Sequence, residues 1–355
     1  MRLKLAILEH DQNYLNRIIS VFNAKYSDKL EIYSFTDLEM AKVALTESKI
    51  DVLVMNNSFD IDISSLPQNC AFAYLVDSVD INHLNGQKAI GKYQKIDLIY
   101  KEILNIYSEK VGSVIDIKSE GGCAKTYLFC SPNGGVGTSS MAAASALHFA
   151  AKGEKTLYLN LEKLGSSDLF FTGEGQFDMS DIIFALKSKN VNLLMKLESC
   201  IKYDRRGVCF FSQPKIALDM VELSQDDIVK LLSELKRSRL YSRIIIDMDF
   251  TLDVGGLTIS DQVDKIIWIG DGSEISNDKI QKAYAAISIM EQDRSLTITK
   301  KLHLIYNKFS NKTGKTVGEI GIKSIGGAPR YDHASTQQVV ENLSKMEMLS
   351  KLMNQ

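Results

Sequence analysis

The chain has 355 residues, of which 45% are hydrophobic and 24% are charged, and its formal net charge at pH 7 is −2. This length favours about two domains, each long enough to bury a core of its own. A charge so close to zero gives no attraction to nucleic acid or acidic lipid, so we expect no nucleic-acid partner.

The five cysteines are scattered and never spaced as CxxC, and the five histidines fall in unrelated segments. These patterns argue against a disulfide framework and against a structural zinc site. No apolar run approaches membrane-spanning length, and the first residues are typical of a strand followed by acids, not of a signal peptide. We therefore expect a cytoplasmic protein.

The first third of the chain alternates β-rich runs with helical patterns. The expected strands are residues 3–8, 30–34, 51–55, 71–76 and 88–91, and the expected helices are residues 13–26, 37–48 and 96–107. This alternation predicts a doubly wound α/β domain of the flavodoxin-like class over residues 1–117. Residues 118–124, KSEGGCA, have the polar, Gly-rich composition of a linker.

The remaining residues, 125–355, predict a second α/β domain with a mostly parallel sheet. Its expected strands are residues 126–130, 156–161, 207–211, 242–247, 265–269 and 302–306. Helices are expected at residues 139–152 and 225–239, and Ser224 with Asp227 has the pattern of a capping box for the latter.

A glycine-rich segment lies between the first strand and the first helix of this second domain. Its residues are Asn133, Gly134, Gly135, Val136, Gly137, Thr138, Ser139 and Ser140. In a phosphate-binding loop, glycines let backbone N–H groups turn toward the anion, and the following helix directs its positive end at it. Thr138 stands where the usual loop has a lysine, and Ser139 stands at the Mg²⁺ ligand position. A turn made only for close packing remains the alternative.

Two further strand ends carry polar residues. Asp247 ends the expected strand 242–247, as the acid that holds a Mg²⁺ water shell does in nucleotide-binding proteins. Asn307 and Lys308 follow the strand 302–306, at the edge where open parallel sheets bind ligands, and an Asn amide matches an adenine edge. A plain strand end or turn is the competing interpretation in both cases.

The segment NGGVGTSS resembles the deviant Walker A loop, KGGxGKT/S, of the ParA and MinD superfamily of P-loop ATPases. The resemblance spans most of residues 125–345. It includes TLYLNLE, with Asn160 and Glu162 at acid positions, and GGAPR, whose Pro329 and Arg330 match the segment that closes over the base. It implies ATP and Mg²⁺ as cofactors, Glu162 and Asp247 as catalytic acids, Ser139 and Asp247 as metal ligands, and a nucleotide-sandwich homodimer.

Within that superfamily the chain is most similar to the TadZ/CpaE proteins of pilus assembly, which join an atypical receiver domain to this kind of ATPase. That resemblance implies a factor that helps to place a Tad-type pilus or secretion apparatus, often at a cell pole. Its partners would be components of that apparatus.

Both lysines of the superfamily loop are absent, because Asn133 and Thr138 occupy their positions. Losing one preorganised stabiliser of transition-state charge costs about 10²–10³ in rate, so we expect weak or absent hydrolysis. Lys163, beside Glu162, is a possible substitute, although a solvated surface lysine is the more ordinary interpretation.

The first domain resembles a response-regulator receiver, and it too lacks a residue that the chemistry of its family requires. Glu9 and His10 stand at its acidic pair, Lys92 at its lysine, and Asn56 at the position of the phosphate-accepting aspartate. Because an amide cannot form an acyl phosphate, we expect no phosphotransfer. A docking or dimerisation surface and a merely stabilising role both stay open.

The C-terminal residues 336–352 have a helical pattern with an apolar stripe. The stripe has no Trp or Phe and its polar side mixes acids and lysines, so core packing is favoured and membrane contact is at most peripheral. Three functions follow as alternatives: an ATP-held scaffold, an active positioning ATPase, or a pseudoenzyme without nucleotide.

Overall fold

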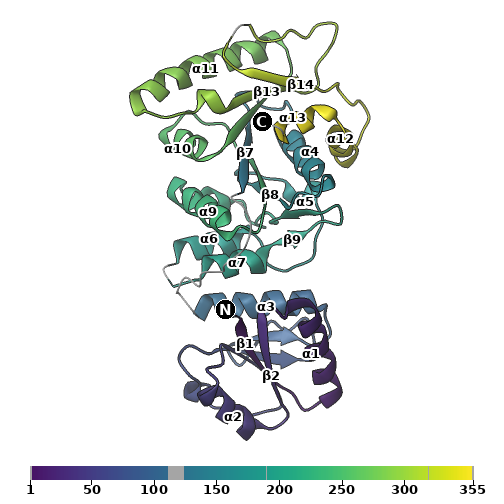
Figure 1. The fold of residues 1–355 in the computed structure, drawn as a ribbon, viewed down its shortest axis with the longest axis vertical. Coiled ribbons are helices and arrows are strands. Elements are labelled where there is room, and N and C mark those ends of the chain that lie inside the picture. The colour runs from purple at the N-terminus through teal and green to yellow at the C-terminus, as the bar shows by residue number, and fades with distance from the viewer. Residues whose placement is uncertain (1, 111–123, 189, 319, 354–355) are drawn as a thin grey trace. The chain divides into compact units, whose positions relative to one another are not determined.

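A computed structural model describes residues 2–110, 124–188, 190–318 and 320–353, which divide into two compact units (Figure 1). The first unit comprises Met1–Lys118 together with Phe184–Cys200, and the second comprises Ser119–Ile183 and Ile201–Gln355. Each unit is α/β, as expected. The expected linker, residues 118–124, lies outside the described residues except for Ala124.

The first unit is built on a six-stranded sheet in the order β2-β1-β3-β4-β6-β5. Its strands are β1 (Leu3–Leu8), β2 (Leu30–Phe35), β3 (Val52–Asn56), β4 (Ala71–Val76), β5 (His83–Leu84) and β6 (Gln87–Gly91). Its helices are α1 (Gln12–Tyr26), α2 (Leu38–Glu47), the short η1 (Ile63–Ser65), α3 (Ile96–Lys110) and α7 (Leu193–Cys200). All strand pairs are parallel except the β5–β6 hairpin. The parallel order 2-1-3-4 followed by β6 confirms the flavodoxin-like prediction.

Helix α7 belongs to the first unit although it lies more than eighty residues further along the chain than α3. Met195 joins the apolar cluster that α1 and α3 form over the sheet. The Lys196 side chain is buried and donates to Asn105 and, at 3.3 Å, to Glu109, while Glu198 accepts from Lys29 and Tyr100. These contacts explain why the unit is not contiguous in sequence.

The second unit is built on an eight-stranded sheet in the order β14-β13-β12-β7-β11-β8-β10-β9. Its strands are β7 (Lys125–Cys130), β8 (Thr156–Asn160), β9 (Lys202–Tyr203), β10 (Val208–Phe210), β11 (Arg243–Asp247), β12 (Lys265–Gly270), β13 (Leu302–Tyr306) and β14 (Lys323–Gly327). Only β9 runs antiparallel to its neighbour, so the prediction of a mostly parallel sheet is confirmed.

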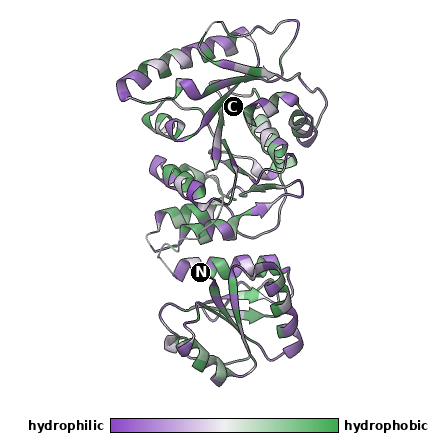
Figure 2. Ribbon diagram, viewed as in Figure 1, coloured by the Kyte–Doolittle hydropathy of each residue, from purple (hydrophilic) through white to green (hydrophobic). Residues whose placement is uncertain are grey.

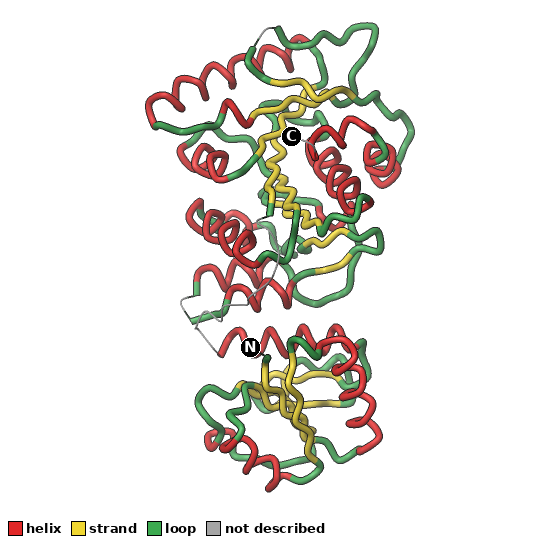
Figure 3. The backbone as a smooth tube through the Cα atoms, in the orientation of Figure 1, coloured by secondary structure: helices red, strands yellow, loops and turns green. Residues whose placement is uncertain are grey.

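Helices cover both faces of this sheet, and Figure 3 shows the strands between two layers of helix. The helices and helical turns are α4 (Thr138–Ala151), α5 (Ser167–Phe170), α6 (Met179–Lys187), α8 (Leu218–Val221), α9 (Gln225–Ser238), α10 (Val254–Gln262), α11 (Glu274–Arg294), η2 (Thr299–Lys301), α12 (Thr336–Ser344), η3 (Glu347–Leu349) and α13 (Ser350–Met353). Helix α6 crosses the division between the two units. The expected capping box of α9 is present, with Ser224 and Asp227 bonded reciprocally.

The sequence explains this layering. The central strands are buried along nearly their whole length, as continuous β-branched and aromatic runs require in a sheet covered on both sides. Figure 2 shows these strands as hydrophobic, while the outer helix α11 is largely hydrophilic. Helix α4 is Ala-rich, and Ala142, Ala143 and Ala144 are fully buried. Small side chains let α4 lie close to the sheet on one side and to α12 on the other.

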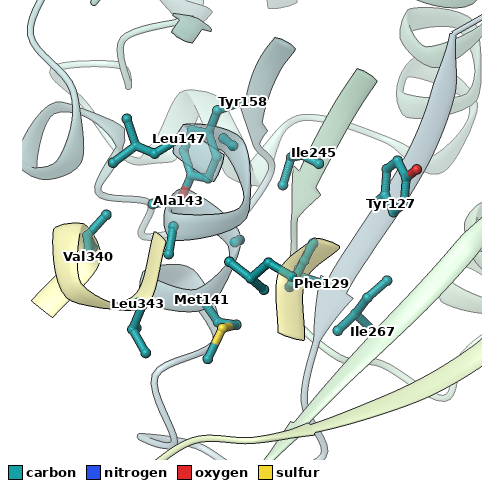
Figure 4. Close-up of a cluster of buried hydrophobic side chains, with 14 of the residues drawn as sticks. Tyr127, Phe129, Met141, Ala143, Leu147, Tyr158, Ile245, Ile267, Val340 and Leu343 are labelled. Carbon is teal, nitrogen blue, oxygen red and sulfur yellow. The ribbon is translucent and has the colours of Figure 1, made fainter. Parts of the chain in front are cut away.

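Figure 4 shows the core that results from this close approach. It joins Tyr127, Phe129, Tyr158, Ile245 and Ile267 from the strands, Met141, Ala143 and Leu147 from α4, and Val340 and Leu343 from α12. The apolar stripe of the C-terminal segment therefore packs in the core, as expected. No helix in the described part of the chain is long and apolar enough to span a membrane.

The prediction of one continuous helix over residues 336–352 is wrong. The segment divides into α12, the turn η3 and α13. The ring of His148 lies at the break, with Nδ1 2.8 Å from the Ser344 carbonyl oxygen and Nε2 3.0 Å from the Ser350 hydroxyl. The buried Met348 and Leu349 side chains also reach the core only if the chain turns after Ser344.

Candidate functional site

The glycine-rich loop connects β7 to α4 at the carboxyl edge of the sheet, in the order strand, loop, helix. Gly135 and Gly137 have positive φ angles of 75° and 86°, and Gly137 is the N-cap of α4. A side chain at Gly137 would meet the Asn307 amide nitrogen at 2.4 Å from its Cβ, so no larger residue fits. Left-handed glycines before a helix N-terminus are the arrangement that presents backbone N–H groups to an anion.

The Asn133 side chain is held within the chain and not left free at the loop. It is buried, and its amide donates to the Ser276 hydroxyl at 2.9 Å and to the Ser276 carbonyl at 3.3 Å. Its backbone N–H donates to the Ser131 hydroxyl, which in turn donates to the Ile269 carbonyl. Asn133 thus fixes the loop to the start of α11, and contributes no charge.

The first turn of α4 contains Thr138, Ser139 and Ser140. The Ser139 hydroxyl donates to the Glu162 carboxylate, 3.2 Å from each oxygen. Glu162 follows β8 and its backbone N–H donates to the Asn160 side chain at 2.9 Å. The structure therefore brings the expected metal ligand and the expected acid into direct contact.

Asp247 lies at the end of β11 and is fully buried. One carboxylate oxygen, Oδ2, accepts from the Tyr158 hydroxyl at 2.7 Å and from the Asn160 amide at 3.1 Å. The same amide reaches Glu162 at 3.1 Å, so Asn160 links the two acids. The other oxygen of Asp247, Oδ1, is buried without a hydrogen-bond partner.

No cationic side chain is bonded to the carboxylates of Asp247 or Glu162 among the described contacts. Burial, followed by the Glu162 charge, raises the pKa of Asp247 well above its usual range, although the Tyr158 hydroxyl opposes the shift. An orphaned carboxylate oxygen next to a second acid and a serine hydroxyl is a donor set that fits a hard divalent cation. Ser139, Asp247 and Glu162 are the residues that would hold Mg²⁺.

In the part of the chain that the structure describes, no three His, Cys, Asp or Glu side chains are grouped so that they could hold a metal ion. Two carboxylates and a hydroxyl instead form an incomplete shell. Mg²⁺ in nucleotide sites is held in this way, by one or two carboxylates together with phosphate oxygens and water. The donor set therefore suits an ion that arrives with a phosphate ligand.

Asn307 and Lys308 extend from the end of β13 to the loop. The Asn307 amide donates to the Val136 carbonyl at 2.8 Å, and the Lys308 amine donates to the Gly135 carbonyl at 2.7 Å. Asn307 is buried and Lys308 is exposed. These two side chains hold the loop in place through its carbonyl groups. The order of the strands alone did not predict these hydrogen bonds.

Pro329 and Arg330 lie beyond β14. Pro329 lines a cavity of about 510 Å³ together with Tyr306, Phe309 and Ala328, whereas Asn307 is not among the described residues that line it. Arg330 is exposed and pairs with Asp332 at 3.0 Å. The structure thus places Asn307 against the loop and Pro329 in a neighbouring cavity.

Three residues that organise the site were not predicted from the sequence: Tyr158, Gln213 and Ser276. Tyr158 lies two residues before Asn160 on β8, and alternation along a strand places both on one face, so this signal was present. Gln213 donates to the Asn160 carbonyl and to the Ser167 hydroxyl, each at 3.2 Å. Gln213 and Ser276 are far from the loop in sequence, and no local pattern marks them.

The first unit carries a separate cluster at the carboxyl edge of its own sheet. The Asn56 amide donates to both Glu9 oxygens, at 2.9 and 2.8 Å, and the Lys92 amine pairs with Glu9 at 2.7 Å and with Asp77 at 2.9 Å. Burial alone would raise the pKa of Glu9, but the bonds from Lys92 and Asn56 outweigh it and lower that pKa. His10 instead stacks on Phe59.

The geometry defines a chain with a receiver-like unit whose acceptor position is an amide, and a unit with a phosphate-loop architecture and an acidic metal-type site. Residues 1–108 match the family model described as TadZ-like, receiver domain. The resemblance predicted for the N-terminal domain is thereby confirmed. No curated protein matches the chain.

Solved structures similar to this chain include the ParA family ATPase from Chlorobium tepidum TLS, with 18% identity, a TM-score of 0.49, and coverage of 64% of this chain and 95% of that one. The MinC:MinD cell division protein complex of Aquifex aeolicus is similar with 16% identity, a TM-score of 0.49, and coverage of 65% and 97%. A plasmid partition protein from Borrelia burgdorferi has 20% identity, a TM-score of 0.46, and coverage of 64% and 99%.

Proposed function

We propose that this chain is an ATP-binding scaffold or localisation factor for a Tad-type pilus or secretion apparatus, with weak or absent hydrolysis. The observation that carries the proposal is that a phosphate-type loop and an acidic metal-type site lie together, while Thr138 occupies the lysine position. The match of residues 1–108 to a TadZ-like receiver domain supports the link to the pilus.

Gly135 and Gly137 have left-handed backbone conformations before α4. This backbone shape suits the phosphates of ATP. Mg²⁺, when bound, would neutralise charge on the acids and on the phosphates. This chain's own residues orient that site: Asn160 joins Glu162 to Asp247, and Gln213 holds the backbone of Asn160. Asn307 holds the loop in place, because its side-chain amide donates to the Val136 carbonyl.

Weak hydrolysis follows from the charges around the loop. Neither Asn133 nor Thr138 is cationic, and the Asn133 amide is already committed to Ser276. Each missing stabiliser of developing charge costs about 10²–10³ in rate. Binding depends more on backbone N–H groups and on the cation, so nucleotide retention without turnover is the expected behaviour.

The receiver-like unit would then serve for docking. Asn56 lacks the carboxylate that acyl phosphate formation requires, and its amide is bonded to Glu9. A labelled phosphodonor that modified residue 56 would contradict this part of the proposal. We further propose a nucleotide-held homodimer that recruits pilus components in the cytoplasm, at a pole, with at most peripheral membrane contact.

An active positioning ATPase is the second candidate, and the contact between Ser139 and Glu162 favours it because an acid lies beside the phosphate loop. A pseudoenzyme that holds no nucleotide is the third, since Thr138 lowers the attraction for a triphosphate. These candidates differ in what the protein binds and in what it turns over.

The deciding experiment identifies the nucleotide released from the purified, denatured protein, followed by a turnover assay with Mg²⁺. Bound ATP or ADP with turnover close to that of an Asp247→Ala variant would support the scaffold. Turnover that is well above that of Asp247→Ala would support the ATPase. Absence of nucleotide, both after purification and on titration with ATP, would contradict both.

A further inference from the structure

The candidate nucleotide loop has no lysine of its own, and a positive charge beside the phosphates would strengthen binding beyond what Mg²⁺ and backbone N–H groups provide. Thr138 occupies the lysine position, and Asn133 is neutral and bonded to Ser276. A positive charge at the phosphates would therefore come from a residue outside the loop.

Lys308 reaches the loop from another strand. Its amine donates to the Gly135 carbonyl at 2.7 Å, and its Cε would lie 3.7 Å from a Cβ placed on Gly137. Gly135 and Gly137 are the two loop residues with positive φ angles. The amine therefore lies along the part of the loop whose backbone is shaped for an anion.

The backbone around Lys308 is held in place for this reach. Lys308 itself adopts a positive φ of 56°, a strained conformation for a residue with a side chain. The residues on both sides are fixed, because Asn307 N–H donates to the Gly270 carbonyl at 2.7 Å and Phe309 N–H donates to the Ala328 carbonyl at 2.9 Å. Strained conformations that the surroundings enforce are concentrated at ligand sites.

The charge of Lys308 is also available. Among the described residues, no carboxylate lies within ion-pair distance of its amine, and the group that it does contact is a neutral carbonyl. Two other cations of this region are paired: Arg330 with Asp332 at 3.0 Å and Lys315 with Glu274 at 3.2 Å. A phosphate oxygen would be a stronger acceptor for the Lys308 amine than the Gly135 carbonyl is.

We propose that Lys308 supplies, from the end of β13, the positive charge toward nucleotide phosphates that the loop lacks at position 138. This inference rests on the proposed nucleotide binding and specifies which residue meets the phosphates. Lys308 would bind phosphate and not the base, whereas the neighbouring Asn307 is directed to the loop carbonyl at Val136.

The test measures binding of ATP, ADP and adenosine to the full chain by calorimetry, with Mg²⁺ present. Lys308→Ala should weaken ATP and ADP binding about 10- to 100-fold, the range expected when a charge-assisted hydrogen bond is lost. Adenosine binding should stay within about twofold, because adenosine has no phosphate. Lys308→Arg should retain most of the affinity, and circular dichroism should verify that each variant is folded.

Two further variants sharpen the result. Adding Thr138→Lys to Lys308→Ala should restore the affinity, because it returns a charge to the usual position in the loop. Lys312→Ala, an exposed lysine in the following segment, is the matched control and should change nothing.

The outcomes separate the two proposals. Wild-type protein that binds no nucleotide overturns the proposed function. Wild-type protein that binds ATP with an affinity unchanged in Lys308→Ala overturns the role of Lys308 alone. A loss seen in Lys163→Ala and not in Lys308→Ala would also overturn it, and would assign the charge to the lysine beside Glu162.

Discussion

The Tyr158 hydroxyl lies 2.7 Å from Oδ2 of Asp247 and donates a hydrogen bond to it in the interior of the second unit. Asn160 donates to the same oxygen at 3.1 Å, and Oδ1 is left without a partner. Two neutral donors therefore hold one side of a buried carboxylate. The other side is the one that a cation would use.

Replacing Tyr158 with Phe should make the Asp247 charge harder to maintain. The hydroxyl lowers the pKa of Asp247 against the larger effect of burial, so its loss should raise that pKa further. We expect the affinity for Mg²⁺–ATP to fall several-fold and the free energy of unfolding to fall by about 1.5–3 kcal/mol, the contribution of one hydrogen bond to a charged group.

Titration with ATP at several Mg²⁺ concentrations, combined with urea unfolding, measures both effects. Tyr74→Phe, in a buried tyrosine of the first unit, provides the control and should be close to neutral. An unchanged Mg²⁺ dependence in Tyr158→Phe would show that the hydroxyl does not position the carboxylate.

Asp247→Asn should be more stable than the wild type at neutral and alkaline pH in the absence of metal. Because burial raises the pKa of Asp247, the folded state binds a proton that the unfolded state has released above about pH 4. The free energy of unfolding therefore falls as pH rises through the raised pKa, and this loss is absent in the amide.

We expect the free energy of unfolding of Asp247→Asn to exceed that of the wild type by about 1–3 kcal/mol at pH 8, and the difference to shrink toward pH 5. A buried polar group without a hydrogen-bond partner costs about that much. Thermal unfolding across this pH range measures it. Millimolar Mg²⁺ with ATP should stabilise the wild type and not Asp247→Asn. A wild type that becomes more stable on going from pH 5 to pH 8, relative to Asp247→Asn, would contradict the shifted pKa.

Asn56→Asp in the receiver-like unit should destabilise the chain at neutral pH. The Asn56 amide donates to both oxygens of Glu9, and an aspartate would replace those bonds with repulsion between two carboxylates. We expect a loss of about 1–3 kcal/mol that is smaller at pH 5, where one acid of the pair is protonated.

Unfolding of the full chain, with and without Mg²⁺, measures this loss. The cation should restore part of the stability, because its charge would offset the repulsion between the two acids. Asn57→Asp, at the exposed next position, is the control. If Asn56→Asp were as stable as the wild type, the Lys92 charge would be sufficient to offset the repulsion between the two carboxylates.

The two absent loop lysines should not be equally easy to restore. Asn133 is buried against Ser276, so Asn133→Lys would break two hydrogen bonds and bury an ammonium group. Thr138 is only half buried at the start of α4. We expect Asn133→Lys to lower the free energy of unfolding by about 1–3 kcal/mol and Thr138→Lys to leave it nearly unchanged.

Thermal unfolding compares the two variants, and nucleotide titration should show tighter ATP binding only for Thr138→Lys. If Asn133→Lys proved as stable as the wild type, the contact with Ser276 would carry no energetic weight.

The strands and helices that the local patterns predicted lie close to their observed bounds, because strand burial and helix periodicity are local properties. Strands β5, β9 and β14 were not predicted. Strands β1, β4 and β13 begin and end at the predicted residues, and the capping box of α9 is present. The C-terminal helix was predicted as continuous because its apolar periodicity continues past Ser344. The break depends on His148, nearly two hundred residues earlier.

The sequence by itself determined the two α/β units, the glycine loop, the serine and acids that we propose for metal binding, and the absence of lysines at positions 133 and 138. Each of these depends on residue type and on near neighbours. Only the tertiary structure decided that Tyr158 holds Asp247, that Ser276 binds Asn133, that α7 completes the first unit and that Lys308 reaches Gly135. These contacts join residues far apart in the chain, so the packing of the sheets and helices creates them and no local pattern encodes them.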